Sequence, residues 1–101
     1  MPMMQQSSFP ALISLFQTLE EHLHNRKLEL ALSAVHSILA TDRNNFYALA
    51  IEHRIKRVLD FLEEPSDVSD STEYYVGIVI AALENVCQMA VRFLMNSPIE
   101  A

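Results

Sequence analysis

Glycine is almost absent from this chain, which contains one Gly, four Pro and no Trp among its 101 residues. A fold of many short strands needs turn residues, chiefly Gly and Pro, at most of its connections, and this composition does not supply them. Half of the residues are nevertheless hydrophobic, which excludes an intrinsically disordered chain. We therefore expect an all-α protein that forms a single helical domain over residues 1–101.

Basic residues are also scarce, because 7 Lys and Arg stand against 13 Asp and Glu, for a net charge of −6. Phosphate binding requires a basic surface that releases counterions, so we expect no nucleic-acid partner. Cys87 is the single cysteine and lies in an apolar segment, which predicts a buried side chain rather than a disulfide or a reactive thiol. The N-terminal stretch MPMMQQSSF lacks the pattern of a secretory signal, and we expect a cytoplasmic protein.

Apolar residues recur every three or four positions in four stretches, which is the pattern of amphipathic helices. Pro10 suits the first turn of the first helix, so residues 1–7 are expected to form a flexible tail. Pro65 ends the third helix, and a polar, acidic loop follows over residues 64–71. The four predicted helices cover about residues 9–24, 27–41, 45–63 and 72–96.

The predicted turns between the first three helices contain asparagines. Asn25 tolerates the left-handed conformation that ends many helices, so we expect it to end the first helix. Asn44 or Asn45 is expected to cap the third helix, because an asparagine side chain can accept a hydrogen bond from a free backbone N–H. Short turns of this kind predict antiparallel neighbouring helices.

The last predicted helix carries far more apolar side chains than one exposed helix needs. Its strongly polar residues fall on one narrow strip and also interrupt the apolar run, so we expect no membrane span. This polar strip consists of Glu84, Asn85, Gln88 and Arg92. A chain of this size buries a modest core, and surplus apolar surface then requires a partner. We expect a homodimer formed through this helix, with a heteromeric partner or burial within the chain as alternatives. The candidate self-association residues are Gly77, Ile80, Ala81 and Val91.

Ala31 is a small residue in the second predicted helix, and Asp42, Asn45 and Ala48 follow the order of an Asp-Pro-x-Asn-x-x-Ala junction. With these features, residues 19–55 resemble a tetratricopeptide repeat that runs into the first helix of a second repeat. The chain departs from the family where the pattern has a small residue, a turn glycine and a helix-breaking proline, at Leu19, Arg26 and Arg43. The expected fold is therefore either tetratricopeptide-like or a generic antiparallel four-helix bundle.

The resemblance implies a non-catalytic scaffold whose first helices line a groove for a partner's peptide. Arg54 and Arg57 could hold an acidic peptide, because guanidinium groups match carboxylates in geometry and charge. The alternative is that both arginines belong to a solvated surface that balances Glu52 and Asp60. Carried over by position, the groove residues are Ile13, Phe16, Glu20, Tyr47, Ala50, Arg54 and Arg57.

Residue patterns for catalysis are weak. Glu21 and His24 have the E-x-x-H spacing of metal-binding bundles, but the chain has no second such motif. Gly77 lies inside a predicted helix, so no phosphate-binding loop is expected. We expect no catalytic residue, no cofactor and no metal, and we expect a protein–protein interaction module or adaptor. The alternatives are a helical bundle that binds a small apolar ligand or a metal, and a structural subunit of a larger complex.

Overall fold

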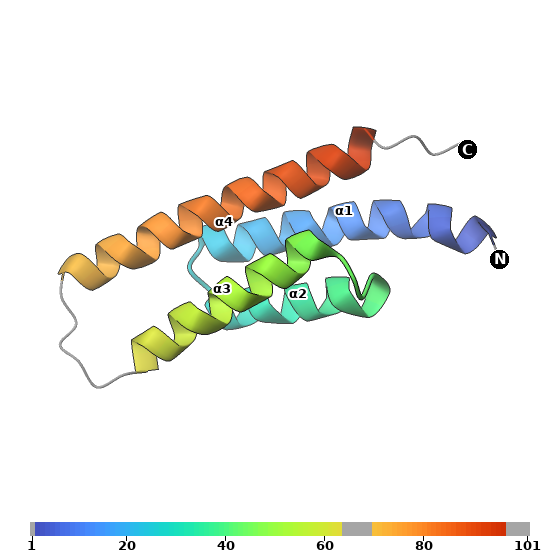
Figure 1. Cartoon of the computed structure of the whole chain (residues 1–101). Coiled ribbons are helices and arrows are strands. Elements are labelled where there is room, and N and C mark those ends of the chain that lie inside the picture. Colours follow the sequence, from blue (N-terminus) through green and yellow to red (C-terminus); the bar gives the residue numbers. More distant parts are fainter. Residues whose placement is uncertain (1, 64–69, 97–101) are drawn as a thin grey trace.

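Four helices build the protein, as the computed structural model shows (Figure 1). The structure describes residues 2–63 and 70–96, and within them the side chains of residues 10–63 and 72–96. The helices are α1 (Pro2–His24), α2 (Leu28–Thr41), α3 (Phe46–Glu63) and α4 (Asp70–Asn96). No strand occurs in the described ranges, so the prediction of an all-α protein with four helices is confirmed.

Each helix buries a stripe of side chains at alternating spacings of three and four residues. In α4 the stripe begins at Val76 and Ile80 and continues through Cys87 to Leu94, and in α1 it runs from Leu12 through Phe16 and Leu19 to Leu23. Such spacing keeps one side of a helix turned towards its neighbours along its whole length. The shorter stripes of α2 and α3 complete the core with Leu28, Ala31, Val35, Ile38, Ala48, Ile51, Ile55 and Val58.

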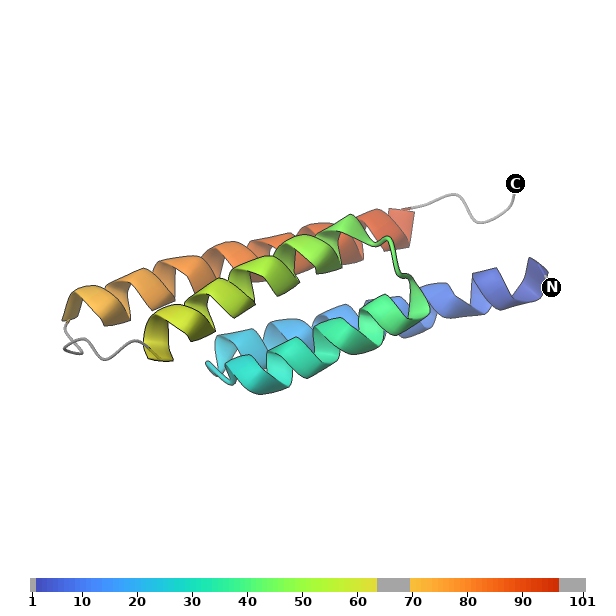
Figure 2. The same ribbon diagram turned by 60° about the horizontal axis from the view of Figure 1, so that its bottom comes forward.

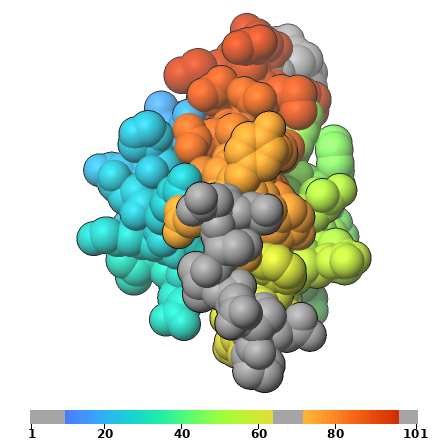
Figure 3. Space-filling view, turned by 90° about the vertical axis from the view of Figure 1, so that its left-hand side faces the viewer, coloured from blue at the N-terminus to red at the C-terminus, as the bar shows by residue number. Residues whose placement is uncertain are grey.

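The helices pack in a ring in which each one contacts the helices before and after it, and α1 closes the ring against α4. Within the described residues, no Cα atom of α1 lies within 8 Å of one in α3, and none of α2 within 8 Å of one in α4, so these pairs lie diagonally opposite. Figure 2 shows the result as two hairpins, α1–α2 and α3–α4, lying side by side. Viewed from one end, α1 and α2 lie on one side, α3 on the other, and α4 between them (Figure 3). The protein is an all-α helical bundle.

The turn between α1 and α2 differs from the prediction in its left-handed residue. Arg26, not Asn25, has a positive φ of 60°. The N–H of Lys27 donates to the carbonyl of His22 over 2.9 Å, and the N–H of Arg26 donates to the carbonyl of Leu23 over 3.0 Å. These two bonds form a Schellman motif, in which the residue one place after the helix cap takes the left-handed conformation.

Two helix starts also differ from their predicted positions. α1 begins at Pro2 rather than near residue 9, so Pro10 lies inside it and residues 2–7 are helical rather than a tail. Met and Gln, which make up residues 3–6, are good helix formers and extend the helix before the proline. α4 begins at Asp70, within the predicted loop, and residues 64–69 of that loop lie outside the described residues. The cap predicted for α3 is Asn45, whose Oδ1 accepts the N–H of Ala48 at 3.0 Å.

Candidate interaction surface

Exposed apolar side chains are concentrated on one half of the bundle. α1 contributes none of the large exposed apolar side chains that the structure describes, and α2 contributes only Leu30. A soluble domain rarely leaves a contiguous apolar patch without a role for it. All the others belong to α3 or α4: Phe46, Leu49, Phe61, Leu62, Tyr74, Tyr75, Ile78, Met89, Phe93 and Met95.

Three polar side chains of α4 form contacts with α1 and with the turn that follows it. Gln88 Nε2 donates to Glu20 Oε2 at 2.7 Å. His24 Nδ1 lies 3.7 Å from Glu84 Oε1, which ties the end of α1 to the middle of α4. Further along, the guanidinium of Arg26 lies 3.0 Å from Glu73 Oε1. These contacts use the polar strip of α4 that the sequence shows, so the opposite side of α4 is left apolar.

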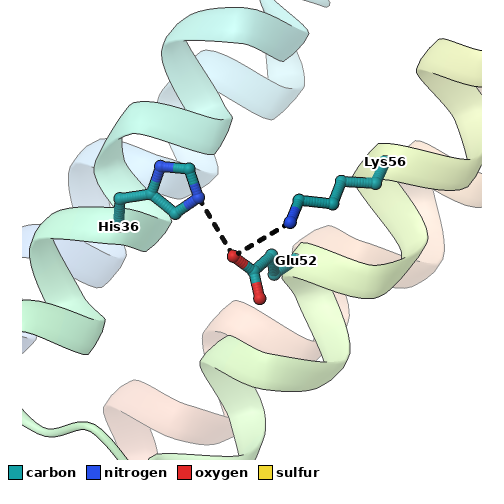
Figure 4. A network of polar contacts seen from close by, with 3 residues as sticks. All are labelled: His36, Glu52 and Lys56. Atoms are coloured by element: carbon teal, nitrogen blue, oxygen red, sulfur yellow. Dashed lines mark hydrogen bonds and ion pairs between the residues drawn. The ribbon is translucent and has the colours of Figure 1, made fainter.

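Polar side chains also form contacts between α3 and α2. Glu52 Oε2 lies 3.0 Å from His36 Nε2 on α2 and 3.5 Å from Lys56 Nζ one helical turn further along α3 (Figure 4). All three side chains are partly exposed, so this cluster contributes at most about 1 kcal/mol to stability. It leaves Lys56 paired on the outer surface of the bundle.

Arg54 and Arg57 lie on the other side of α3, towards α4, and differ from Lys56. Neither guanidinium has an ion pair or a hydrogen bond with any residue of the described ranges. Both line a hollow of about 290 Å³ between α3 and α4, together with His53 and Tyr75. Two guanidinium groups without an ion pair in the described ranges are therefore held beside an opening in the surface.

A second, apolar hollow continues the first along the α3–α4 seam. It has a volume of about 260 Å³, and it shares Arg54 and Val79 with the first hollow, so the two form one continuous depression. We call this depression the α3–α4 groove. It is basic at the end near Arg57 and apolar at the other end, where it is lined by Ala50, Ile51, Ile78, Ala82, Leu83 and Val86.

Aromatic pairs stand at both ends of the α3–α4 groove. The rings of Phe61 and Tyr75 have centroids 5.0 Å apart at one end. At the other end, the rings of Tyr47 and Phe93 have centroids 6.1 Å apart, and Phe46 stacks on Tyr47 at 4.3 Å. Over their whole lengths, α3 and α4 have fewer close backbone approaches than any other two neighbouring helices. The two hollows lie between the aromatic pairs.

The residues carried over from the tetratricopeptide resemblance fall into separate places. Ala50, Arg54 and Arg57 line the α3–α4 groove. Phe16 is fully buried, although its ring and that of Tyr47 border one hollow of about 240 Å³ at the end of the bundle.

Ile13 packs partly buried against the core, and Glu20 faces α4 through its bond with Gln88. The structure thus brings Ala50, Arg54 and Arg57 together with α4, whereas Tyr47 shares a hollow with Phe16 of α1. The apolar residues of α4 that complete the groove were not predicted, although Ile78, Ala82 and Val86 recur at helical spacing in the sequence.

The residues predicted for self-association lie mostly on other sides of α4. Ile80 is buried in the core with 5% of its surface exposed, so it has little to offer a second copy. Val91 packs partly buried against the core, and Ala81 is exposed. A Cβ placed on Gly77 would lie 3.3 Å from the guanidinium of Arg26, so this small residue makes room for a side chain of its own chain.

Side chains suited to metal binding are not brought together in the part of the chain that the structure describes. No cluster of three His, Cys, Asp or Glu side chains with metal-binding geometry occurs there.

Cys87 is fully buried, and burial raises the pKa of its thiol from 9.0 to about 12, with Glu20 and Glu84 adding to the shift. A thiol with so high a pKa stays protonated near neutral pH and is a poor nucleophile.

By length and composition alone, residues Thr72–Asn96 of α4 are sufficient to cross a membrane. In the structure this helix packs along α1 and α3, yet only 28% of its most apolar window is buried. The sequence prediction of no membrane span therefore stays a prediction. This buried share is similar to those of α1 and α3, and the exposed apolar side chains of α4 include Ile78, Met89 and Phe93.

Comparison with known proteins finds no matching family model, no matching curated protein and no matching solved structure. The tetratricopeptide resemblance of residues 19–55 is thus neither supported nor opposed by a relative. Inferences about function depend on the surface geometry described above.

Proposed function

We propose that this protein is a non-catalytic protein–protein interaction module that binds its partner through the α3–α4 hairpin. The observation that carries the proposal is the concentration of exposed apolar side chains on α3 and α4, with Ile78 52% exposed and Phe93 57% exposed. Burying such a surface against a partner is the main favourable contribution to most protein associations. The paired polar contacts elsewhere on the bundle give α1 and α2 no comparable surface.

Co-purification with matched variants tests this function. The full chain is isolated from its own cells as the wild type, as Ile78→Glu and as Ser33→Glu, which adds the same charge to the exposed outer side of α2. We expect proteins that accompany the wild type and Ser33→Glu but are lost from Ile78→Glu. Companions that all three forms retain equally, or none with any form, would contradict the proposal.

Self-association through α4 is the second candidate, because α4 is long and exposes large apolar side chains such as Ile78, Met89 and Phe93. Light scattering during size exclusion, over about a hundredfold range of concentration, measures the molar mass directly. A homodimer formed through α4 predicts a mass near twice that of the 11.5 kDa chain, returning to the chain mass in Ile78→Glu. A mass near 11.5 kDa at every concentration would remove this candidate.

A further inference from the structure

The α3–α4 groove has a shape suited to one more helix. Its apolar lining on α4 recurs at Ile78, Ala82 and Val86, with the spacing of one side of a helix. Ala82 on α4 and Ala50 on α3 line the same hollow and are small, so the backbone of a third helix can approach closely between them. From Tyr75 to Val86 the groove spans about 17 Å, which is about three helical turns.

The charges of the groove indicate what kind of helix it accepts. Arg54 lies where the basic and apolar hollows join, and Arg57 and His53 line the basic hollow. The two hollows contain no carboxylate among their described lining residues. Guanidinium groups that lack an internal partner gain most from carboxylates supplied by another molecule.

We infer that the α3–α4 groove binds an acidic amphipathic helix from a different protein. The apolar stripe of that helix packs between Ala50 and Ala82, and its carboxylates pair with Arg54 and Arg57. This inference rests on the proposed function and adds the chemical class of the partner. It also makes the two arginines the residues that select the partner, while the apolar hollow supplies contact area.

A second copy of the chain fits the same groove poorly. A two-fold symmetric dimer brings the same patch of both copies together, and Arg54 lies in the middle of this patch. The arginines of the two copies would then face each other without carboxylates.

Selection from a displayed peptide library tests the inference. The library consists of amphipathic helices of 14 residues with a fixed apolar stripe and flanking positions varied among Glu, Gln and Lys. The full chain is the bait, as the wild type, as Arg54→Glu/Arg57→Glu, and as Lys27→Glu/Arg43→Glu, which makes the same change of charge at exposed residues of the two turns. Circular dichroism checks that each bait is folded, and Arg54→Gln and Arg57→Gln replace the double variant if it is not.

We expect the wild type and the Lys27→Glu/Arg43→Glu control to enrich Glu-flanked helices, and the Arg54→Glu/Arg57→Glu variant to enrich Lys-flanked ones. For the best acidic peptide, fluorescence anisotropy should show binding roughly tenfold weaker to the Arg54→Glu/Arg57→Glu variant, the effect of two partly exposed ion pairs. If the single Gln variants are used, the same peptide should bind each about threefold more weakly.

Other outcomes overturn the inference in distinguishable ways. Enrichment that needs an intact Ile78 but shows no preference for Glu contradicts the acidic partner and leaves the proposed function standing. No enrichment over an Ile78→Glu bait contradicts both the acidic partner and the proposed function. A dimer that Arg54→Glu/Arg57→Glu leaves intact and Ile78→Glu breaks shows that a second copy occupies the groove. Binding of the wild type to vesicles of phosphatidylcholine and phosphatidylserine, lost in Ile78→Glu, shows that the surface meets lipid instead.

Discussion

The α1–α2 hairpin and the α3–α4 hairpin are built on the same alternating spacing of core residues but differ beside that stripe. In α1, the buried stripe from Leu12 to Leu23 has exposed polar neighbours such as Gln17 and Thr18. In α4, the buried stripe is flanked on its α3 side by apolar residues such as Ile78 and Phe93. The core pattern determines the bundle, whereas the residues beside it determine which hairpin has surface left for a partner.

The two hairpins should differ most in the free energy of unfolding that is lost when an aromatic side chain is removed, because the side chain is buried in one hairpin and exposed in the other. Phe16 on α1 is fully buried, and Phe93 on α4 is 57% exposed. We expect Phe16→Ala to lower the free energy of unfolding by about 3–5 kcal/mol, and Phe93→Ala by about 1 kcal/mol. Urea unfolding followed by circular dichroism measures both values. Equal losses would mean that the α3–α4 hairpin is packed as tightly as α1–α2.

The buried side of α4 should be packed as closely as the α1–α2 hairpin. The pKa of the Cys87 thiol, which lies on that side, is a measure of this packing. The thiol has a pKa of 9.0 when unfolded and about 12 when buried, so between these values the folded chain binds more protons than the unfolded chain. The free energy of unfolding therefore falls as pH rises above 9.0, by at most about 1.4 kcal/mol per pH unit.

Cys87→Ala lacks this contribution, while its other groups titrate as in the wild type. Urea unfolding of both proteins from pH 8 to 11 measures the difference in slope. Parallel pH profiles would show that the thiol is open to solvent and that α4 does not bury its inner side.

The start of α3 offers a local way to weaken one hairpin only. Asn45 caps α3 through its bond to the N–H of Ala48, whereas the neighbouring Asn44 is exposed and bonds to no described side chain. We expect Asn45→Ala to cost about 1 kcal/mol and Asn44→Ala less than about 0.5 kcal/mol. Hydrogen exchange should show faster exchange in the first turns of α3 in Asn45→Ala. Faster exchange spread evenly over all four helices would contradict separate behaviour of the two hairpins.

The smallest effect on stability is expected within the α3–α4 groove itself. Ile78 is 52% exposed, so Ile78→Glu should change the free energy of unfolding by about 0.5 kcal/mol or less. The same variant should weaken binding of a groove partner at least about tenfold, because a buried carboxylate would replace an apolar contact. Thermal unfolding and fluorescence anisotropy separate the two quantities. A large loss of stability would show that Ile78 serves the bundle rather than a partner.

Helix positions followed from sequence where the spacing of apolar residues was regular. The ends of α2 and α3 lie within one residue of their predicted positions, and Asn45 caps α3 as one of the two predicted residues. Pro10 misled the prediction of the first helix, because a proline fits a first turn and disrupts a helix interior, yet α1 begins at Pro2 and contains Pro10.

The α3–α4 groove could not be predicted from the spacing of apolar residues, because it depends on which helices are neighbours in space. Arg54 and Arg57 were identified as candidates, but the apolar lining residues Ile78, Ala82 and Val86 were assigned to no site. Closure of the ring by α1 against α4 pairs the polar strip of α4 with Glu20 and His24, and this contact turns the apolar side of α4 towards α3. Such a choice among neighbours is made by tertiary packing, which one sequence alone does not display.

Site-specific photo-crosslinking in the protein's own cells tests the central claim most directly. Benzoylphenylalanine is placed at position 78, in the α3–α4 groove, and in a control at position 33, on the exposed outer side of α2. We predict a discrete product larger than the chain from position 78 and none from position 33. Equal products from both positions, or none from position 78, would contradict the claim that α3 and α4 form the binding surface.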